Sequence, residues 1–133
     1  MNTSFNPPGW KRPKGYANVI AATGKTIFIA GQIGWNSNEE FETDDFTGQT
    51  MQALSNIKVC LETAGAGPQH LVRLTWYVTD KKEYLASLEQ VGVVYREVLG
   101  RCYPTMALVQ VAGLIESRAK VEIEATAVVP DTN

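Results

Sequence analysis

The end of the chain carries two carboxylates at a spacing that hydrolytic chemistry can use. Glu122 and Glu124 are separated by one residue, so in a strand they project from the same face, about 7 Å apart. A carboxylate at a partly buried interface can position or activate a water molecule. The alternative is a solvated or salt-bridged pair beside Arg118 and Lys120. For Glu124 the solvated or salt-bridged interpretation is as plausible as the catalytic one. For Glu122 it is the less plausible of the two.

Other residue types that support catalysis are scarce. The sequence contains one histidine, His70, and two cysteines, Cys60 and Cys102, with no Cys-x-x-Cys motif. A single histidine excludes the paired-histidine zinc motifs and makes any serine or cysteine triad depend on His70. Because His70 follows a loop rich in glycine, we expect it at the surface. Both cysteines are expected to be free thiols.

Charge and hydropathy exclude several classes of protein. The 133 residues carry a formal net charge of −2, which opposes a basic groove for phosphates, so nucleic acid is not expected as a partner. The N-terminus lacks the pattern of a signal peptide, and no apolar run approaches the roughly 18 residues of a membrane span. We expect a cytoplasmic protein with no membrane contact, folded as a single domain over residues 1–133.

Hydrophobic periodicity predicts an α+β fold in the order ββαβαββ. Strands are expected at residues 16–22, 26–35, 71–79, 103–114 and 119–129, the first two joined as a hairpin across Gly24-Lys25. One helix is expected to begin at Asp45 or Thr47 and to end near Gly65, and a second to span residues 81–99. Two helices suffice to cover one face of such a sheet.

Two of the predicted strands are apolar on both faces. In strand 26–35, Phe28 and Ala30 alternate with isoleucines, and strand 103–114 shows a similar pattern. A sheet with two apolar faces and helices for only one needs a partner subunit, which predicts a homo-oligomer. In the alternative, the N-terminal arm and the polar loop 36–45 cover the second face.

Several segments, in their order and spacing, resemble the Rid family (reactive intermediate deaminase, YjgF-like). They are Gly15-Tyr16-Ala17-Asn18, Ile27 to Ile33, Asn56-Ile57-Lys58, Leu74 to Asp80, Tyr103-Pro104-Thr105 and Val121 to Ala125. The resemblance implies a chorismate-mutase-like fold and a homotrimeric barrel that binds small organic molecules in clefts between subunits. It also implies hydrolysis of enamines or imines to a 2-oxo acid and ammonia, with no metal and no organic cofactor.

Three positions match the family's site. The resemblance makes Glu122 the glutamate that positions the attacking water, Tyr16 an aromatic side chain of the cleft, and Gly31 part of its backbone lining. Tyr16 is a hydrogen-bond donor in this interpretation, and an ordinary strand aromatic in the alternative. The resemblance therefore names Glu122 as the candidate catalytic residue.

Three other positions depart from the family's pattern. Met106 stands where the deaminases have the arginine that holds the substrate carboxylate, Leu108 replaces a short polar or thiol residue, and Ala30 replaces a serine. A thioether offers neither the charge nor the bidentate geometry of arginine, so the chain resembles an arginine-lacking subgroup. Met106 and Leu108 are expected either to line an apolar pocket or to pack at an interface.

Further side chains remain as open alternatives. Trp35 and Trp76 are expected either in an aromatic pocket or in the core. The role of the missing arginine, binding the substrate carboxylate, could be taken by any of three others: Arg73, Arg96 and Arg101.

Two hypotheses for function follow. The first is an enamine or imine deaminase that uses Glu122, and the second is a non-catalytic trimer that binds a small molecule or modulates a partner. Ribonuclease activity, ascribed to some family members, fits the negative charge and the lone histidine badly.

Overall fold

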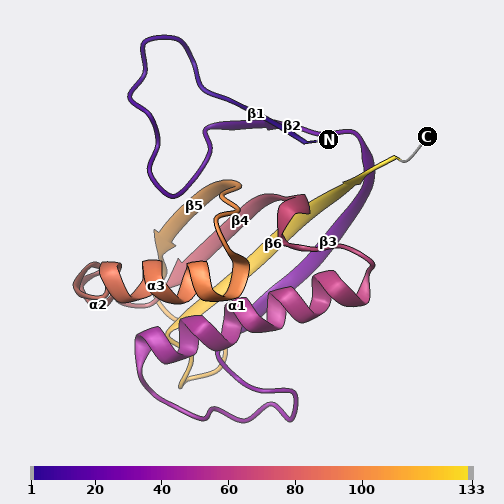
Figure 1. Ribbon diagram of the computed structural model, residues 1–133. Helices are drawn as coiled ribbons and strands as arrows, with labels where there is room; N and C mark the ends of the chain where they lie inside the picture. The colour runs from indigo at the N-terminus through magenta and orange to yellow at the C-terminus, as the bar shows by residue number, and fades with distance from the viewer. Residues whose placement is uncertain (1, 132–133) are drawn as a thin grey trace.

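The computed structural model describes residues 2–131, in which a four-stranded sheet carries helices on one face and a two-stranded sheet lies beside it (Figure 1). Its elements are β1 (Thr3–Phe5), β2 (Val19–Ala21), β3 (Gly24–Ile33), α1 (Phe46–Thr63), the short 3-10 helix η1 (Pro68–His70), β4 (Leu71–Val78), α2 (Lys81–Ala86), α3 (Leu88–Leu99), β5 (Thr105–Gln110) and β6 (Val121–Pro130). The predicted α+β class is confirmed.

The main sheet has the strand order β3-β6-β4-β5. β6 pairs antiparallel with β3 and β4, whereas β4 and β5 are parallel. Along β6, Val121, Ile123 and Ala127 are wholly buried on the helix side, while Glu122 and Glu124 alternate with them. The predicted alternation along the last strand is therefore confirmed, and both carboxylates face away from the helices.

The predicted helices cover one face of this sheet. Asp45 caps α1 by accepting a hydrogen bond from the Gly48 amide at 2.9 Å. Leu54, Ile57 and Leu61 recur at helical spacing and are fully buried. No helix among residues 2–131 is both long and apolar enough to cross a membrane.

A buried amide on α1 fixes the start of β6. The side chain of Gln49 is fully buried, and its Nε2 donates to the carbonyls of Thr43 and Arg118 at 3.2 and 3.0 Å. Its Oε1 accepts from the Lys120 amide at 2.8 Å. Because Lys120 immediately precedes β6, these bonds anchor the strand that carries Glu122.

The predicted hairpin across Gly24-Lys25 is wrong. β2 is shorter than the predicted strand and pairs with β1, while β3 begins at Gly24 and pairs with β6. A Cβ at Gly24 would lie 2.1 Å from the Val129 carbonyl oxygen, and its φ is +144°. The glycine therefore serves the close approach of β6 rather than a tight turn. As a consequence, Tyr16 lies in the N-terminal arm and not in a strand.

Other predicted boundaries also change. The helix expected over residues 81–99 breaks at Ser87, whose hydroxyl donates to the Glu83 carbonyl at 2.8 Å and which separates α2 from α3. The strand expected over residues 103–114 is reduced to β5. Hydrophobic periodicity does not reveal the break at Ser87, because the apolar residues on both sides of it keep helical spacing.

The face of the sheet opposite the helices is apolar only along its outer strands. Phe28 on β3 and Val109 on β5 are 79% and 45% exposed, so neither the arm nor the polar loop covers this face in the single chain. The two inner strands instead present polar side chains there, among them Arg73 and Tyr77. The two strands predicted to be apolar on both faces are the outer ones, β3 and β5, so the prediction is confirmed at the margins of this face, and the centre of the face is polar.

Candidate functional site

The six expected site residues lie on opposite faces of the main sheet. Tyr16, Met106 and Leu108 line a pocket on the helix side. Ala30, Gly31 and Glu122 belong to the open face, where Ala30 borders a shallow groove with Arg73 and Glu124. The sequence therefore identified two half-sites that one chain does not bring together.

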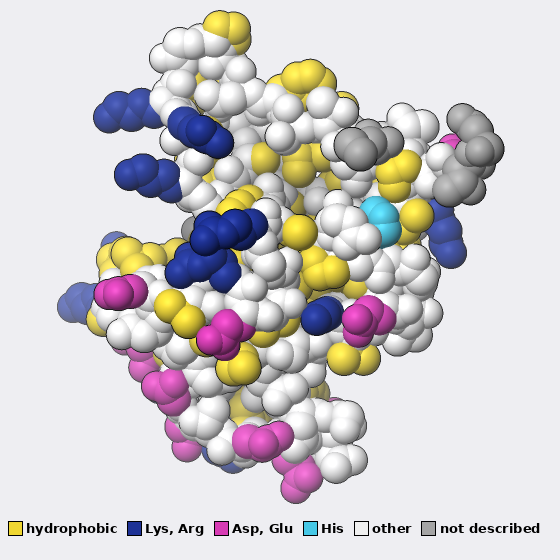
Figure 2. Space-filling view, viewed as in Figure 1, with side chains coloured by type: hydrophobic (Ala, Val, Ile, Leu, Met, Phe, Trp, Pro, Cys, Tyr) yellow, Lys and Arg dark blue, Asp and Glu magenta, His cyan; other side chains and the backbone are white. Residues whose placement is uncertain are grey.

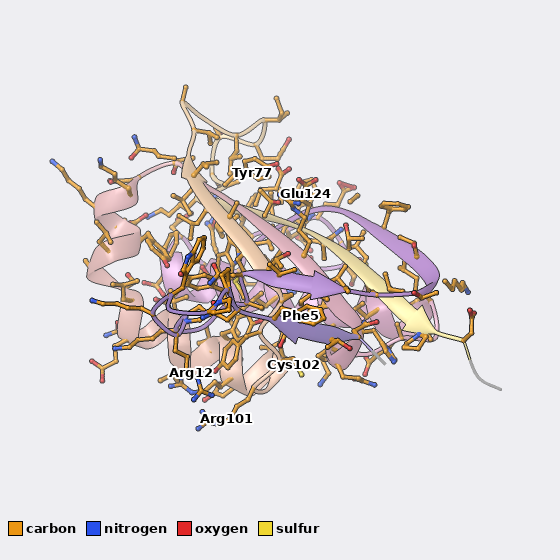
Figure 3. The ribbon with its side chains drawn as sticks, turned by 90° about the horizontal axis from the view of Figure 1, so that it is seen from above. Phe5, Arg12, Tyr77, Arg101, Cys102 and Glu124 are labelled. Atoms are coloured by element: carbon orange, nitrogen blue, oxygen red, sulfur yellow. The ribbon has the colours of Figure 1, made fainter. Side chains whose placement is uncertain are left out.

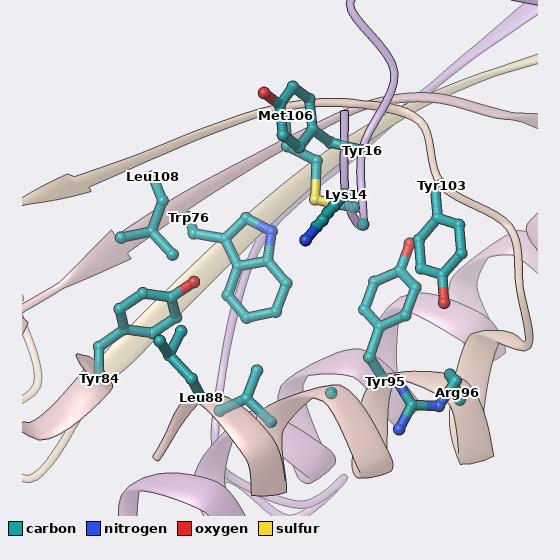
Figure 4. Close-up of a pocket in the computed structure, with 13 residues that line it drawn as sticks. Lys14, Tyr16, Trp76, Tyr84, Leu88, Tyr95, Arg96, Tyr103, Met106 and Leu108 are labelled. Carbon is teal, nitrogen blue, oxygen red and sulfur yellow. The ribbon is translucent and has the colours of Figure 1, made fainter. Parts of the chain in front are cut away.

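The helix-side pocket lies between β4, β5, α3 and residues 14–16 of the arm (Figure 4). Its volume is about 410 Å³, within the usual range for sites that bind organic molecules. Its walls are mostly aromatic and aliphatic, comprising Tyr16, Trp76, Tyr84, Leu88, Val91, Tyr95, Tyr103, Met106 and Leu108. Lys14 and Arg96 supply the only charged groups among its lining residues.

A stack of three aromatic rings forms one wall of this pocket. The Tyr95 ring stacks on Trp76 with centroids 6.5 Å apart and on Tyr103 with centroids 5.5 Å apart. The Tyr95 hydroxyl donates to the Cys102 carbonyl. Burial raises the pKa of Tyr95, so this hydroxyl stays protonated and the wall stays neutral.

Met106 and Leu108 reach the pocket because of the register between β4 and β5. Met106 lies opposite Leu74, which is fully buried, and Leu108 lies opposite Trp76. Both are half-buried and pack against the core. Of the two alternatives for these residues, an apolar pocket or packing at an interface, the single chain shows the apolar pocket.

The two carboxylates of the open face have different surroundings. Glu124 Oε1 accepts a hydrogen bond from the Tyr77 hydroxyl at 2.7 Å, and the two side chains lie together in Figure 3. This bond, followed by desolvation, raises the pKa of Tyr77. The Glu122 side chain, by contrast, is half-buried, and its carboxylate has no hydrogen bond or ion pair with any residue in the described part of the chain. Its oxygens are available to a water molecule.

Gly31 makes room for the Glu122 carboxylate. A Cβ at Gly31 would lie 2.2 Å from Glu122 Oε2 and 2.8 Å from its Cδ. The residue lies where the register between β3 and β6 shifts, between Ile29 and Gln32, as at a β-bulge. The missing side chain and the bulge together set where the carboxylate lies.

The two half-sites are too far apart within one chain to share a small molecule. Met106 is opposite Leu74 on β4 and Glu122 is opposite Tyr77, three residues further along. With β5 and β6 on either side of β4, ordinary strand spacings place their Cα atoms on the order of 14 Å apart. Their side chains also point to opposite faces. A ligand that contacts both would have to lie between two copies of the chain.

The histidine and the cysteines form no catalytic cluster. His70 Nδ1 accepts a hydrogen bond from the Gly67 amide at 3.0 Å, which is a local role. Cys60 and Cys102 are free thiols, as predicted. Within residues 2–131, no three His, Cys, Asp or Glu side chains gather as a metal site would require.

The structure also places the tryptophans and arginines named as alternatives. Trp76 belongs to the buried core and also lines the pocket, whereas Trp35 packs on Phe41 with ring centroids 5.8 Å apart. Of the three arginines, Arg96 lines the pocket, Arg73 borders the open-face groove, and Arg101 lies beside the arm.

Sequence reasoning missed several of the pocket residues, among them Lys14, Tyr84, Tyr95 and Tyr103. Tyr84 and Tyr95 belong to the apolar set of the predicted helix, which also fits simple core packing. No pattern in the sequence distinguishes the two uses, because the pocket forms only where α3 and the arm, which bridges to β5 between Ala17 and Thr105, lie together.

Comparison with solved structures places this fold in one class. The structure of YyfB, a Rid family protein of unknown function from Yersinia pestis, superposes with a TM-score of 0.86 at 32% identity, covering 96% of this chain and 98% of that one. The structure of Escherichia coli TdcF with bound serine gives a TM-score of 0.68 at 30% identity, covering 82% and 84%. The chain has the fold of Rid proteins.

Sequence comparison gives the family directly. The family model described as Endoribonuclease L-PSP matches residues 10–129. A RutC family protein of Pyrococcus horikoshii is 35% identical over 113 residues, covering 84% of this chain and 85% of the relative. A 2-iminobutanoate/2-iminopropanoate deaminase of Capra hircus is 32% identical over 105 residues, covering 78% and 73%. The chain belongs to this family, the Rid or YjgF-like family.

Proposed function

We propose that this protein hydrolyses imines or enamines, with Glu122 positioning and deprotonating the attacking water. The observation that carries the proposal is the state of this carboxylate: it is half-buried beside Gly31 and has no bonding partner among residues 2–131, whereas Glu124 is bonded to Tyr77. Relatives named as deaminases support the same reaction class. A half-buried carboxylate without a bonding partner is suited to general base catalysis.

The reaction needs only water and one group that accepts and returns protons. As the water oxygen bonds to the imine carbon, Glu122 takes a water proton, the C=N electron pair moves to nitrogen, and Glu122 then returns this proton to the nitrogen. In the resulting carbinolamine, Glu122 takes the hydroxyl proton and passes it to the amino nitrogen, the C–N bond breaks, and ammonia leaves with that bond's electron pair. The products are a carbonyl compound and ammonia, and the carboxylate is regenerated.

The catalytic unit in this proposal is a homotrimer with each site shared between two copies. Two features support it: the exposed Phe28 and Val109 at the margins of the open face, and the separation of Met106 from Glu122 within one chain. Copies that pack through their sheets would cover these apolar margins. They would also bring Glu122 of one copy to the pocket of the next.

A second candidate function is ligand binding without catalysis. It is favoured by Met106, which places a thioether on the pocket wall instead of a cation. In this case the pocket would bind a small molecule, and Glu122 would have no role in turnover.

The test is an assay in which an amino-acid oxidase generates 2-imino acids and the protein is scored for faster release of the 2-oxo acid. We expect acceleration by the unmodified chain and a loss of about a hundredfold or more in Glu122→Gln. Glu124→Gln is the matched control, because it changes the neighbouring carboxylate on the same face, and it should retain activity within about threefold.

The outcomes separate the two candidates. If Glu122→Gln and Glu124→Gln behave alike, Glu122 is not the catalytic residue. If the unmodified chain accelerates no imine of small or large amino acids yet binds a carboxylic acid, the binding function stands in place of the deaminase.

A further inference from the structure

The Trp76 indole N–H is an unpaired donor at the helix-side pocket. Trp76 is 4% exposed, and its Nε1 is shielded from solvent with no hydrogen-bond partner in the described part of the chain. Buried donors without a partner are rare in folded proteins because their desolvation is uncompensated. In Figure 4 the nitrogen edge of this indole faces the side of the pocket where the Lys14 ammonium lies. A bound acceptor would satisfy the donor.

The pocket also carries positive charge without a matching carboxylate. Lys14 and Arg96 line it, no Asp or Glu does, and neither cation forms an ion pair within residues 2–131. Figure 2 shows Lys and Arg side chains gathered where the N-terminal arm faces the helices. Cations beside a donor in a partly closed pocket favour an anionic ligand group.

Gly92 leaves space for one of these cations. A Cβ at this position of α3 would lie 3.2 Å from Arg96 Nη1, so the guanidinium folds back over the glycine. Glycine inside a helix is unfavourable relative to alanine. The space over Gly92 is therefore filled by Arg96 on the pocket side of the helix.

We infer that this pocket binds an aromatic carboxylate, with the ring among Trp76, Tyr84 and Tyr95 and the carboxylate toward Trp76 Nε1 and Lys14, while Arg96 adds positive charge elsewhere on the pocket wall. Aromatic walls favour a flat apolar body, and the volume of about 410 Å³ accommodates more than a short-chain acid. Insofar as it rests on the proposed function, the inference names the substrate class: imines of aromatic amino acids rather than of small ones. The binding claim itself needs no hydrolysis.

Calorimetric titration of the full chain with three unreactive probes tests this. 3-Phenylpropanoate has both the ring and the charge, propanoate lacks the ring, and 3-phenylpropanamide lacks the charge. We expect 3-phenylpropanoate to bind at least about tenfold more tightly than either of the others. Equal binding of propanoate, equal binding of the amide, or no binding of 3-phenylpropanoate would overturn the inference.

Variants test the role of the indole nitrogen. Trp76→Phe keeps an aromatic ring but removes the donor, and we expect affinity for 3-phenylpropanoate to fall about tenfold with the oligomeric state and circular dichroism unchanged. Trp35→Phe, away from the pocket, should bind as the unmodified chain does. Lys14→Gln, at an exposed position, gives a second reading if Trp76→Phe folds poorly, with a several-fold loss expected. Unchanged affinity in Lys14→Gln and in a folded Trp76→Phe would contradict the inference.

The same titration keeps this inference separate from the proposed reaction. Tight binding of 3-phenylpropanoate together with no hydrolysis of any imine would refute the deaminase while the aromatic pocket stands. Hydrolysis of small imines without binding of 3-phenylpropanoate would refute the aromatic pocket while the deaminase stands.

Discussion

The two faces of the main sheet are built for different tasks. The helix-side pocket is lined by stacked aromatic rings, and its charged groups are both cations. The open face is broad, carries the carboxylates Glu122 and Glu124, and is apolar only at its margins. The helix-side pocket can bind a ligand but has no base, and the open face has carboxylates that can act as a base but no comparable pocket.

In the proposed trimer, this difference makes a single chain an incomplete catalytic unit. Strand alternation forces neighbouring residues to opposite faces, so a binding pocket and a base that lie on opposite faces of a sheet cannot meet without a second copy. Assembly through the open face would remedy both deficits, since it would cover the apolar margins and join the half-sites.

The largest effect is expected from a charge on the open face. Phe28→Glu places a carboxylate on a side chain that is 79% exposed in the single chain, and we expect complete loss of the trimer in sedimentation velocity. Val59→Glu is the matched control, because Val59 is 61% exposed but lies on α1. A trimer that survives Phe28→Glu, or that is lost equally in the control, would show that this face is not the interface.

A smaller effect is expected from filling the space beside Glu122. The added methyl group of Gly31→Ala would contact the carboxylate and displace it, so we expect kcat for imine hydrolysis to fall about tenfold to a hundredfold with affinity for the acid probes nearly unchanged. Gly113→Ala, where nothing lies within 4 Å of the new Cβ, is the control. If affinity falls and kcat does not, Gly31 belongs to the binding site instead.

The smallest effect concerns stability at alkaline pH. Burial raises the pKa of Tyr95 in the folded chain above the ordinary value of 10.0, so the unfolded chain ionises first and stability is lost as the pH rises past about 10. Tyr95→Phe removes the hydrogen bond to the Cys102 carbonyl, so its free energy of unfolding at pH 7 should be about 1 kcal/mol lower. Between pH 7 and 10.5, however, the free energy of unfolding of this variant should fall less steeply than that of the unmodified chain. Urea unfolding between pH 7 and 10.5 measures both, and an unchanged alkaline slope would contradict this account.

The sequence predicted the fold best where periodicity was strong. β6 alternates from Val121 to Ala127, and the apolar residues of α1 recur at helical spacing, so the predicted bounds of both elements are close to those in the structure. The predicted hairpin at Gly24 was wrong because glycine allows the close approach of two backbones as well as tight turns. Only the tertiary pairing with β6 distinguishes these two uses.

The candidate site was predicted only in part for a similar reason. The resemblance found Tyr16, Met106 and Glu122, but the side of the sheet on which each lies depends on register. Tyr95 and Tyr103 could not be assigned, because their stacking depends on how α3 packs beside β5. Local patterns contain no information about such packing.

The most direct test of the shared site is complementation between two inactive variants. Glu122→Gln keeps the pocket, and Met106→Glu keeps the base but places a repelling carboxylate in the pocket. When the two chains are refolded together in equal amounts, a site formed between copies should be intact at about one quarter of the interfaces of random trimers, and about that fraction of the unmodified imine hydrolysis should return. A mixture no more active than its parents, with mixed trimers verified by mass spectrometry, would show that pocket and base do not join across subunits.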